Sequence, residues 1–229
     1  MRFPLSSDGA KKLFLASILI VVSGALAIIV GLIGIAVKES ENEVLGGFVG
    51  FLGILVLLLT LAGFILEIVG TNKGKTEEKN FQYALYGIIA CIVFAILNMF
   101  IDNTVVSVII SVLGTVANVL VYFFIFAAFI SLFTQAGDTA MVDKAKLTRI
   151  IVIAAIVLAD ILSIVTRFMH DVSLQTAVSV IDTIGSIISI AGFVFMMLYY
   201  KKASEVLPTI KAATELAEEA PAPEQPVEE

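Results

Sequence analysis

The chain has 229 residues, of which 59% are hydrophobic and 15% charged, and its net charge is −6. A soluble domain contains about 45–50% apolar and about 25% charged residues, so this composition predicts that the main partner of the protein is the lipid bilayer. It excludes a soluble enzyme and a nucleic-acid-binding module, and a single cysteine excludes a disulfide-rich secreted scaffold.

Six apolar runs follow one another along the chain, each near or above the ~20 residues that a helix needs to cross a bilayer. They cover residues 13–37, 45–69, 83–101, 104–133, 150–168 and 176–200. Helices satisfy their own backbone hydrogen bonds in lipid, and the closed-barrel alternative needs alternating segments that these runs lack. We therefore predict an all-α fold: one transmembrane domain over residues 1–202, a polytopic bundle of six transmembrane helices.

Basic residues predict the orientation of this bundle. Of the 14 Lys and Arg residues, only Lys38 and Arg167 fall on the side that the chain reaches after an odd number of spans. Basic residues resist translocation, so the other side is predicted to be cytoplasmic, with both termini inside the cell and the bundle in the cell membrane. Four tyrosines are predicted to anchor the cytoplasmic interface: Tyr83, Tyr86, Tyr199 and Tyr200.

Small residues line one stripe on each of the first two spans. Gly24, Ala27, Gly31 and Gly34 form the first stripe, and Gly46, Gly50 and Gly53 form the second. Such stripes permit close backbone approach between helices in lipid. We interpret them as the packing surface of this hairpin, and the alternative is a face for a homo-oligomer or a membrane-complex partner.

A weak internal repeat accompanies the six spans. Similar tripeptides occur at residues 62–64, 127–129 and 191–193, at spacings of 65 and 64 residues. If three two-span units repeat, they are related by an axis along the membrane normal, which is a pseudo-threefold arrangement of hairpins. The alternative is chance similarity between apolar segments. The mitochondrial carriers are also built from three two-span units, and the chain resembles them in this respect only, because none of its spans contains their characteristic proline.

Three acidic residues interrupt the spans: Glu67, Asp160 and Asp182. A carboxylate at the centre of a transmembrane helix costs about 2.5–3.5 kcal/mol on insertion scales. Glu67 is close to one end of its span, so we expect it to reach the interface or Lys73. Asp160 and Asp182 lie roughly 12 Å and roughly 9 Å from the outer ends of two adjacent spans, so we expect them to share one depth.

Polar residues continue from these aspartates at helical spacing, which places each set on one helix face. The candidate binding residues are Thr115 and Asn118 in the fourth span, Asp160, Ser163 and Arg167 in the fifth, and Ser179, Asp182 and Ser186 in the sixth. In the structural interpretation, Arg167 neutralises one aspartate and hydroxyl groups bond the rest. In the functional interpretation, these residues line a hydrated cavity that binds a cation, a proton or a small polar solute.

The functional hypothesis is therefore a small transporter or a channel-like permeation protein. The alternative is a non-transporting scaffold or accessory subunit, which proline-free spans favour because many transporter sites use interrupted helices. We do not predict an enzyme: two membrane aspartates resemble those of intramembrane aspartyl proteases, but residues 179–182 lack the glycines of that signature. No metal site or cofactor is predicted, since His170 and Cys91 are each the only residue of their type.

The segment 203–229 contains four of the five prolines and many acidic residues. Such a composition cannot bury enough apolar surface to fold, so we predict a disordered cytoplasmic tail. A short helix within residues 204–220, broken at Pro208, is the structured part that we expect. A docking peptide is the alternative interpretation of this tail.

Overall fold

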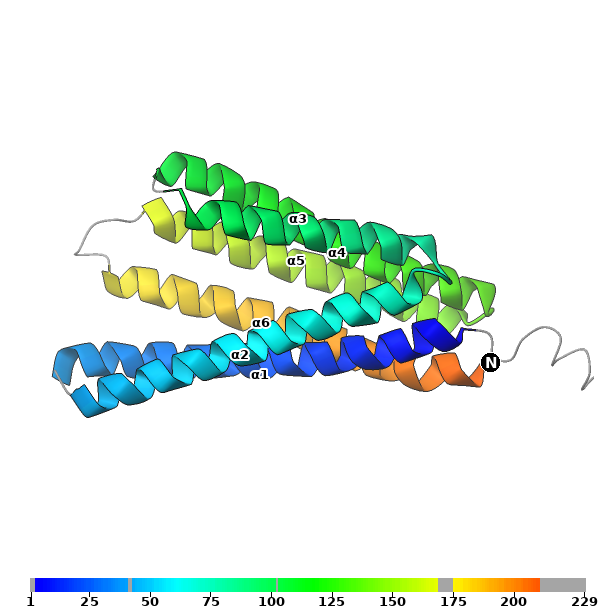
Figure 1. Cartoon of the computed structure of the whole chain (residues 1–229), viewed down its shortest axis with the longest axis horizontal. Coiled ribbons are helices and arrows are strands. Elements are labelled where there is room, and N and C mark those ends of the chain that lie inside the picture. The colour runs from blue at the N-terminus through cyan, green and yellow to red at the C-terminus, as the bar shows by residue number, and fades with distance from the viewer. Residues whose placement is uncertain (1–2, 41–42, 102, 169–174, 211–229) are drawn as a thin grey trace, which may run out of the picture.

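The computed structural model describes residues 3–40, 43–101, 103–168 and 175–210. His170 and most of the acidic tail lie outside these residues. Six long helices account for nearly all of the described chain (Figure 1). They are α1 (Pro4–Ser40), α2 (Glu43–Gly74), α3 (Lys79–Met99), α4 (Thr104–Gln135), α5 (Thr139–Phe168) and α6 (Gln175–Val206), followed by a short 3-10 helix, η2 (Leu207–Thr209).

All six helices are long and apolar enough to cross a membrane. The prediction of an all-α bundle with six spans is therefore confirmed, and the chain is an integral membrane protein. Several helices extend beyond the predicted spans, because amphipathic turns continue the apolar runs. In α5, the first turns bury Met141, Val142 and Ala145 on one face, while Lys144 and Lys146 on the other face are exposed.

The helix ends follow local sequence signals. Glu78 and Asn103 cap α3 and α4 by accepting hydrogen bonds from Asn80 N and Val106 N. Gly137 has a φ of 75° in the turn between α4 and α5, a conformation that favours glycine. Helix α6 ends at Val206, and Pro208, which has no backbone N–H, lies in η2; most of the short helix predicted within residues 204–220 lies outside the described residues.

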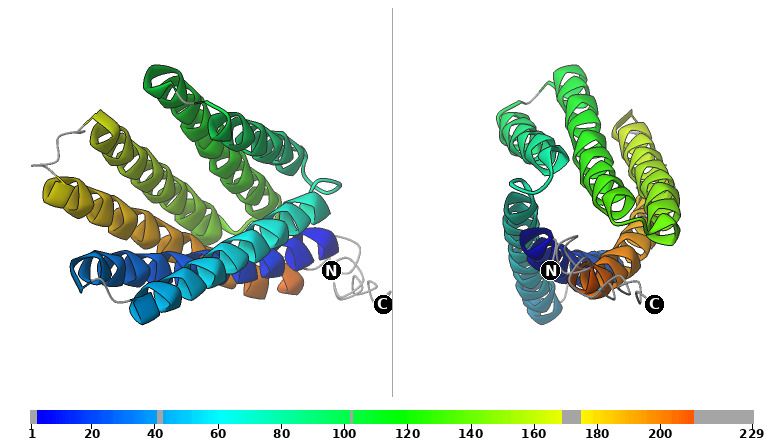
Figure 2. Two further views of the ribbon diagram at one scale, coloured as in Figure 1. Left: turned by 60° about the vertical axis from the view of Figure 1, so that its left-hand side comes forward. Right: turned by 90° about the vertical axis from the view of Figure 1, so that its right-hand side faces the viewer.

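The helices form three successive antiparallel hairpins, whose strongest contacts are within the pairs α1–α2, α3–α4 and α5–α6. Between hairpins, α6 packs on α1 and α5 packs on α4, whereas α2 and α3 make the fewest contacts of all neighbouring pairs. Figure 2 shows that the helices gather at one end and fan apart at the other. We call the gathered end, which carries the α2–α3 and α4–α5 connections, the inner end, and the opposite end the outer end.

An aromatic cluster closes the inner end. It consists of Phe126, Phe129, Phe133, Tyr199 and Tyr200, all at most 4% exposed, with neighbouring ring centroids 5.4–6.5 Å apart. The prediction that Tyr199 and Tyr200 anchor at the membrane interface is therefore wrong, because both rings pack against α4. Tyr83 and Tyr86 are exposed, as an interfacial position requires.

Of the glycines in the two stripes, only Gly34 faces the partner helix of the first hairpin, where a methyl group would lie 4.0 Å from Val49 Cγ1. A methyl group built on Gly31, Gly46, Gly50 or Gly53 would meet no atom within 4 Å. The close approach of α1 and α2 occurs at Gly63 instead, where such a methyl would lie 3.2 Å from the carbonyl oxygen of Ala16, and at Gly9 and Gly70. Gly24 faces Ile190 of α6. The alternative, an association face on α2, stays a prediction.

The internal repeat also stays a prediction. The ring of hairpins has the neighbour order that three repeated units require. However, the offset of 64 residues pairs Thr104, where α4 begins, with Phe168, where α5 ends. The helix boundaries therefore do not follow a repeat without gaps.

Candidate functional site

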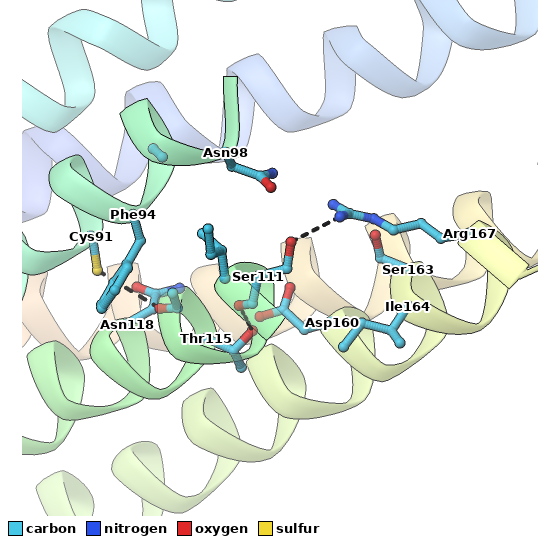
Figure 3. A pocket seen from close by; sticks show the side chains of 13 residues that line it. Cys91, Phe94, Asn98, Ser111, Thr115, Asn118, Asp160, Ser163, Ile164 and Arg167 are labelled. Carbon is cyan, nitrogen blue, oxygen red and sulfur yellow. Dashed lines mark hydrogen bonds between the residues drawn. The ribbon is translucent and has the colours of Figure 1, made fainter. Parts of the chain in front are cut away.

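A polar cavity of about 380 Å³ lies between the outer halves of α3, α4 and α5. Figure 3 shows this outer cavity with the polar side chains directed into it. Its polar lining consists of Asn98 from α3, Ser111, Thr115 and Asn118 from α4, and Asp160, Ser163 and Arg167 from α5. The structure thus brings together five of the eight residues predicted for the site.

Arg167 connects α5 to α4 at the outer end of this cavity. Its guanidinium donates hydrogen bonds to Ser107 Oγ at 3.2 Å and Ser111 Oγ at 2.8 Å. Ser107 in turn donates to the side-chain oxygen of Asn98 on α3 at 2.8 Å. The expectation that Arg167 neutralises an aspartate is wrong for the described residues, since no ion pair joins it to Asp160 or Asp182.

Asp160 lies where two cavities meet. Besides the outer cavity, it lines a second cavity of about 360 Å³ between α5 and α6, together with Ser163, Asp182 and Ser186. Its side chain is half-buried, and within the described parts of the chain its carboxylate accepts no hydrogen bond and forms no ion pair. A charged group at this depth without a protein partner is available to water or to a ligand.

Asp182 is a weaker candidate for a binding residue than Asp160. It is exposed, and its Oδ1 accepts a hydrogen bond from Thr166 of α5 at 3.0 Å. Both aspartates line the second cavity, so the two helices bring the carboxylates to the same region. Helix α6 is held to α5 here by hydroxyl–carboxylate contact and not by an ion pair.

The other predicted residues bond mainly to their own helices. Thr115 and Ser186 donate to the backbone carbonyls of Ser111 and Asp182, one turn earlier. The carbonyl of Ser179 accepts from Thr183 in the same way, and Ser179 lines neither cavity. No group of three or more His, Cys, Asp or Glu side chains suited to a metal ion occurs within the described ranges.

A buried acidic residue was missed as a site candidate. Glu67 on α2 is only 6% exposed, and its side chain hydrogen-bonds with that of Tyr122 on α4. The expectation that Glu67 reaches the interface or Lys73 is therefore wrong, because Lys73 pairs with Asp8 of α1. The available signal was the position of Glu67 inside an apolar run, but only the tertiary fold places Tyr122 of α4 beside it.

No protein family model, curated protein or solved structure matches this chain. The functional argument therefore depends on the cavities and the residues that line them.

Proposed function

We propose that the protein is a small permeation protein, a transporter or channel-like protein, that binds a small cation or polar solute in the outer cavity. The observation that carries this proposal is Asp160, a carboxylate without a protein partner in the described chain that faces both cavities. Insertion of such a group costs about 2.5–3.5 kcal/mol, which is not recovered by a structural contact here. A solvated cavity or a bound cation would recover it.

The lining suits solutes with both hydrogen-bond donors and acceptors. Asp160 accepts, Arg167 donates, and the amides Asn98 and Asn118 do both. Two serines orient the guanidinium, so its remaining N–H groups are presented at a defined position. In the orientation that the basic residues predict, both termini are cytoplasmic and the outer cavity is on the extracellular side.

Cys91 offers a direct test because it is the only cysteine and lines the outer cavity. We expect a charged, membrane-impermeant methanethiosulfonate reagent to modify Cys91 in the full-length protein in liposomes, measured by mass spectrometry. The matched control is Val93→Cys in a Cys91→Ala background, because Val93 is exposed on the same helix but does not line the cavity. A Cys91 that reacts only after denaturation would contradict a hydrated cavity.

Solute flux tests the role of Asp160. Proteoliposomes are assayed for uptake of radiolabelled sodium, rubidium and methylammonium, and Asp160→Asn is expected to lower uptake by about tenfold or more, equivalent to about 1.4 kcal/mol of binding free energy. Asp143→Asn, at an exposed position on the inner part of α5, is the control that retains uptake.

A non-transporting scaffold is the second candidate function. Two observations favour it: the aromatic cluster packs the inner end tightly, and the six described membrane helices are uninterrupted, whereas many transporter sites use interrupted helices. Uptake equal to that of protein-free vesicles in every variant, with an unreactive Cys91, would support the scaffold and exclude the permeation protein.

A further inference from the structure

Glu67 is a buried carboxyl group that does not itself line the outer cavity. It lies on α2 at the level where α4 and α6 pack together, and it lines neither the outer cavity nor the cavity between α5 and α6. Its partner Tyr122 is 3% exposed and packs edge-on against Phe193 of α6, with ring centroids 5.9 Å apart. Both members of the pair are therefore shielded from solvent.

The groups around Glu67 provide hydroxyls and a thiol but no cation. Tyr122 from α4 hydrogen-bonds to it, and Tyr200 from α6 and Cys91 from α3 interact with it electrostatically. In the described residues, Lys73 pairs with Asp8, and no ion pair reaches Glu67. A buried carboxylate without a counter-ion is strongly disfavoured relative to the neutral acid.

A groove runs along α2 from the inner end toward Glu67. This groove of about 550 Å³ separates α2 from α3, the neighbouring helices with the fewest contacts. Exposed Asn72, Lys75 and Gln82 line it near the inner end, and its deeper part, which extends as far as Ile68, is lined mainly by isoleucines of α3. The polar part of this groove begins at Asn72, five residues after Glu67, so the inner side is the nearer source of a proton for Glu67.

We propose that Glu67 is a proton-binding site whose occupancy keeps its side chain against Tyr122 of α4 and keeps the inner end of the bundle closed. In the neutral form, Glu67 remains buried on Tyr122. Loss of the proton to water leaves a carboxylate that must be hydrated, which separates Glu67 from Tyr122 and moves α2 outward at the side where α2 and α3 are already least connected. If the protein is a permeation protein, this separation would open the inner end and couple solute movement to protons, and only this coupling rests on the proposed function.

Infrared difference spectroscopy of the full-length protein in lipid tests proton binding directly. We expect the C=O stretch of a protonated carboxylic acid to disappear as the pH is raised, and this band to be absent in Glu67→Gln. Tyr122→Phe should shift the band because it removes the hydrogen bond to Glu67. Asp143→Asn is the control that keeps the wild-type band. A band that is unchanged in both Glu67→Gln and Tyr122→Phe would overturn the proposal.

Hydrogen–deuterium exchange tests the effect on packing. After correction for intrinsic exchange, amides of α2 near Glu67 should exchange at least about tenfold faster at high pH than at low pH in the wild type, equivalent to about 1.4 kcal/mol of local opening. In Glu67→Gln, which mimics the neutral acid, this pH dependence should vanish. The same pH dependence in both proteins would overturn the proposed closure. Neither measurement uses solute flux or Cys91 labelling. The two proposals are therefore tested independently: either the proton site or the permeation function can be contradicted while the other is supported.

Discussion

Gly9 and Gly70 show how single residues set the distance between α1 and α2. A methyl group on Gly9 would lie 2.6 Å from the carbonyl oxygen of Gly70, and one on Gly70 would lie 2.9 Å from the carbonyl oxygen of Gly9. Real Cβ atoms do not approach backbone oxygen so closely, and backbone atoms cannot rotate away. The two helices can therefore meet at this point only where both residues lack a side chain.

We expect Gly9→Ala to destabilise the protein by about 1–3 kcal/mol, the usual cost of overpacking. Gly53→Ala is the matched control, since its added methyl group meets no atom within 4 Å. Thermal unfolding in detergent, followed by circular dichroism, should show a lower midpoint for Gly9→Ala only. Equal midpoints for the two variants would show that the helices are not in close contact at Gly9.

At the scale of the element, a carboxylate from the α2–α3 turn caps the start of α1. Glu77 accepts hydrogen bonds from the backbone N–H groups of Leu5, at 2.9 Å, and Ser6, at 2.7 Å. These N–H groups have no partner within the helix, and a negative charge there also favours the helix dipole. The cap joins α1 to a turn about seventy residues away in sequence, next to the pair formed by Lys73 and Asp8.

Glu77→Gln should cost about 1–2 kcal/mol of stability, because a neutral amide replaces a charged acceptor of two hydrogen bonds. Glu205→Gln is the comparison, since the exposed pair of Glu205 with Lys202 is worth about 0–1 kcal/mol. Proteolysis of α1 or amide exchange at residues 4–8 should increase in Glu77→Gln and not in Glu205→Gln. If the two variants behave alike, the cap does not stabilise α1.

At the scale of the whole molecule, one end of the bundle is packed and the other is open to polar groups. Phenylalanine and tyrosine fill the inner end, whereas serine, threonine, asparagine and aspartate face the outer cavities. The weakest connection in the ring of helices, between α2 and α3, is close to the buried Glu67. In the proposed permeation protein, the packed inner end is the closed side of the bundle.

The predicted orientation can be checked with reporter fusions. A green fluorescent protein fused after Glu229 should fluoresce, and alkaline phosphatase fused after Met99, at the outer end of α3, should be active. The exchanged fusions should be inactive. The reverse pattern would place the outer cavities on the cytoplasmic side.

The sequence predicts the helices of the fold, but only part of the candidate site. Six long apolar runs predicted the helices, and polar residues at helical spacing pointed to Asp160, Asn118 and Arg167, which line one cavity. The spacing could not show that Arg167 bonds to Ser107 and Ser111 of α4, because this depends on how two helices are placed relative to each other.

The sequence by itself determined that the chain forms six membrane helices, since length and apolar composition decide this in a solvent that cannot bond to the backbone. Only the tertiary structure decided which side of each helix is buried. In lipid, residues that face the bilayer and residues that face the core are equally apolar, so the pattern that reveals the core of a soluble protein is weak. That is why Glu67, Tyr199 and Tyr200 were expected at the interface and are found buried between helices.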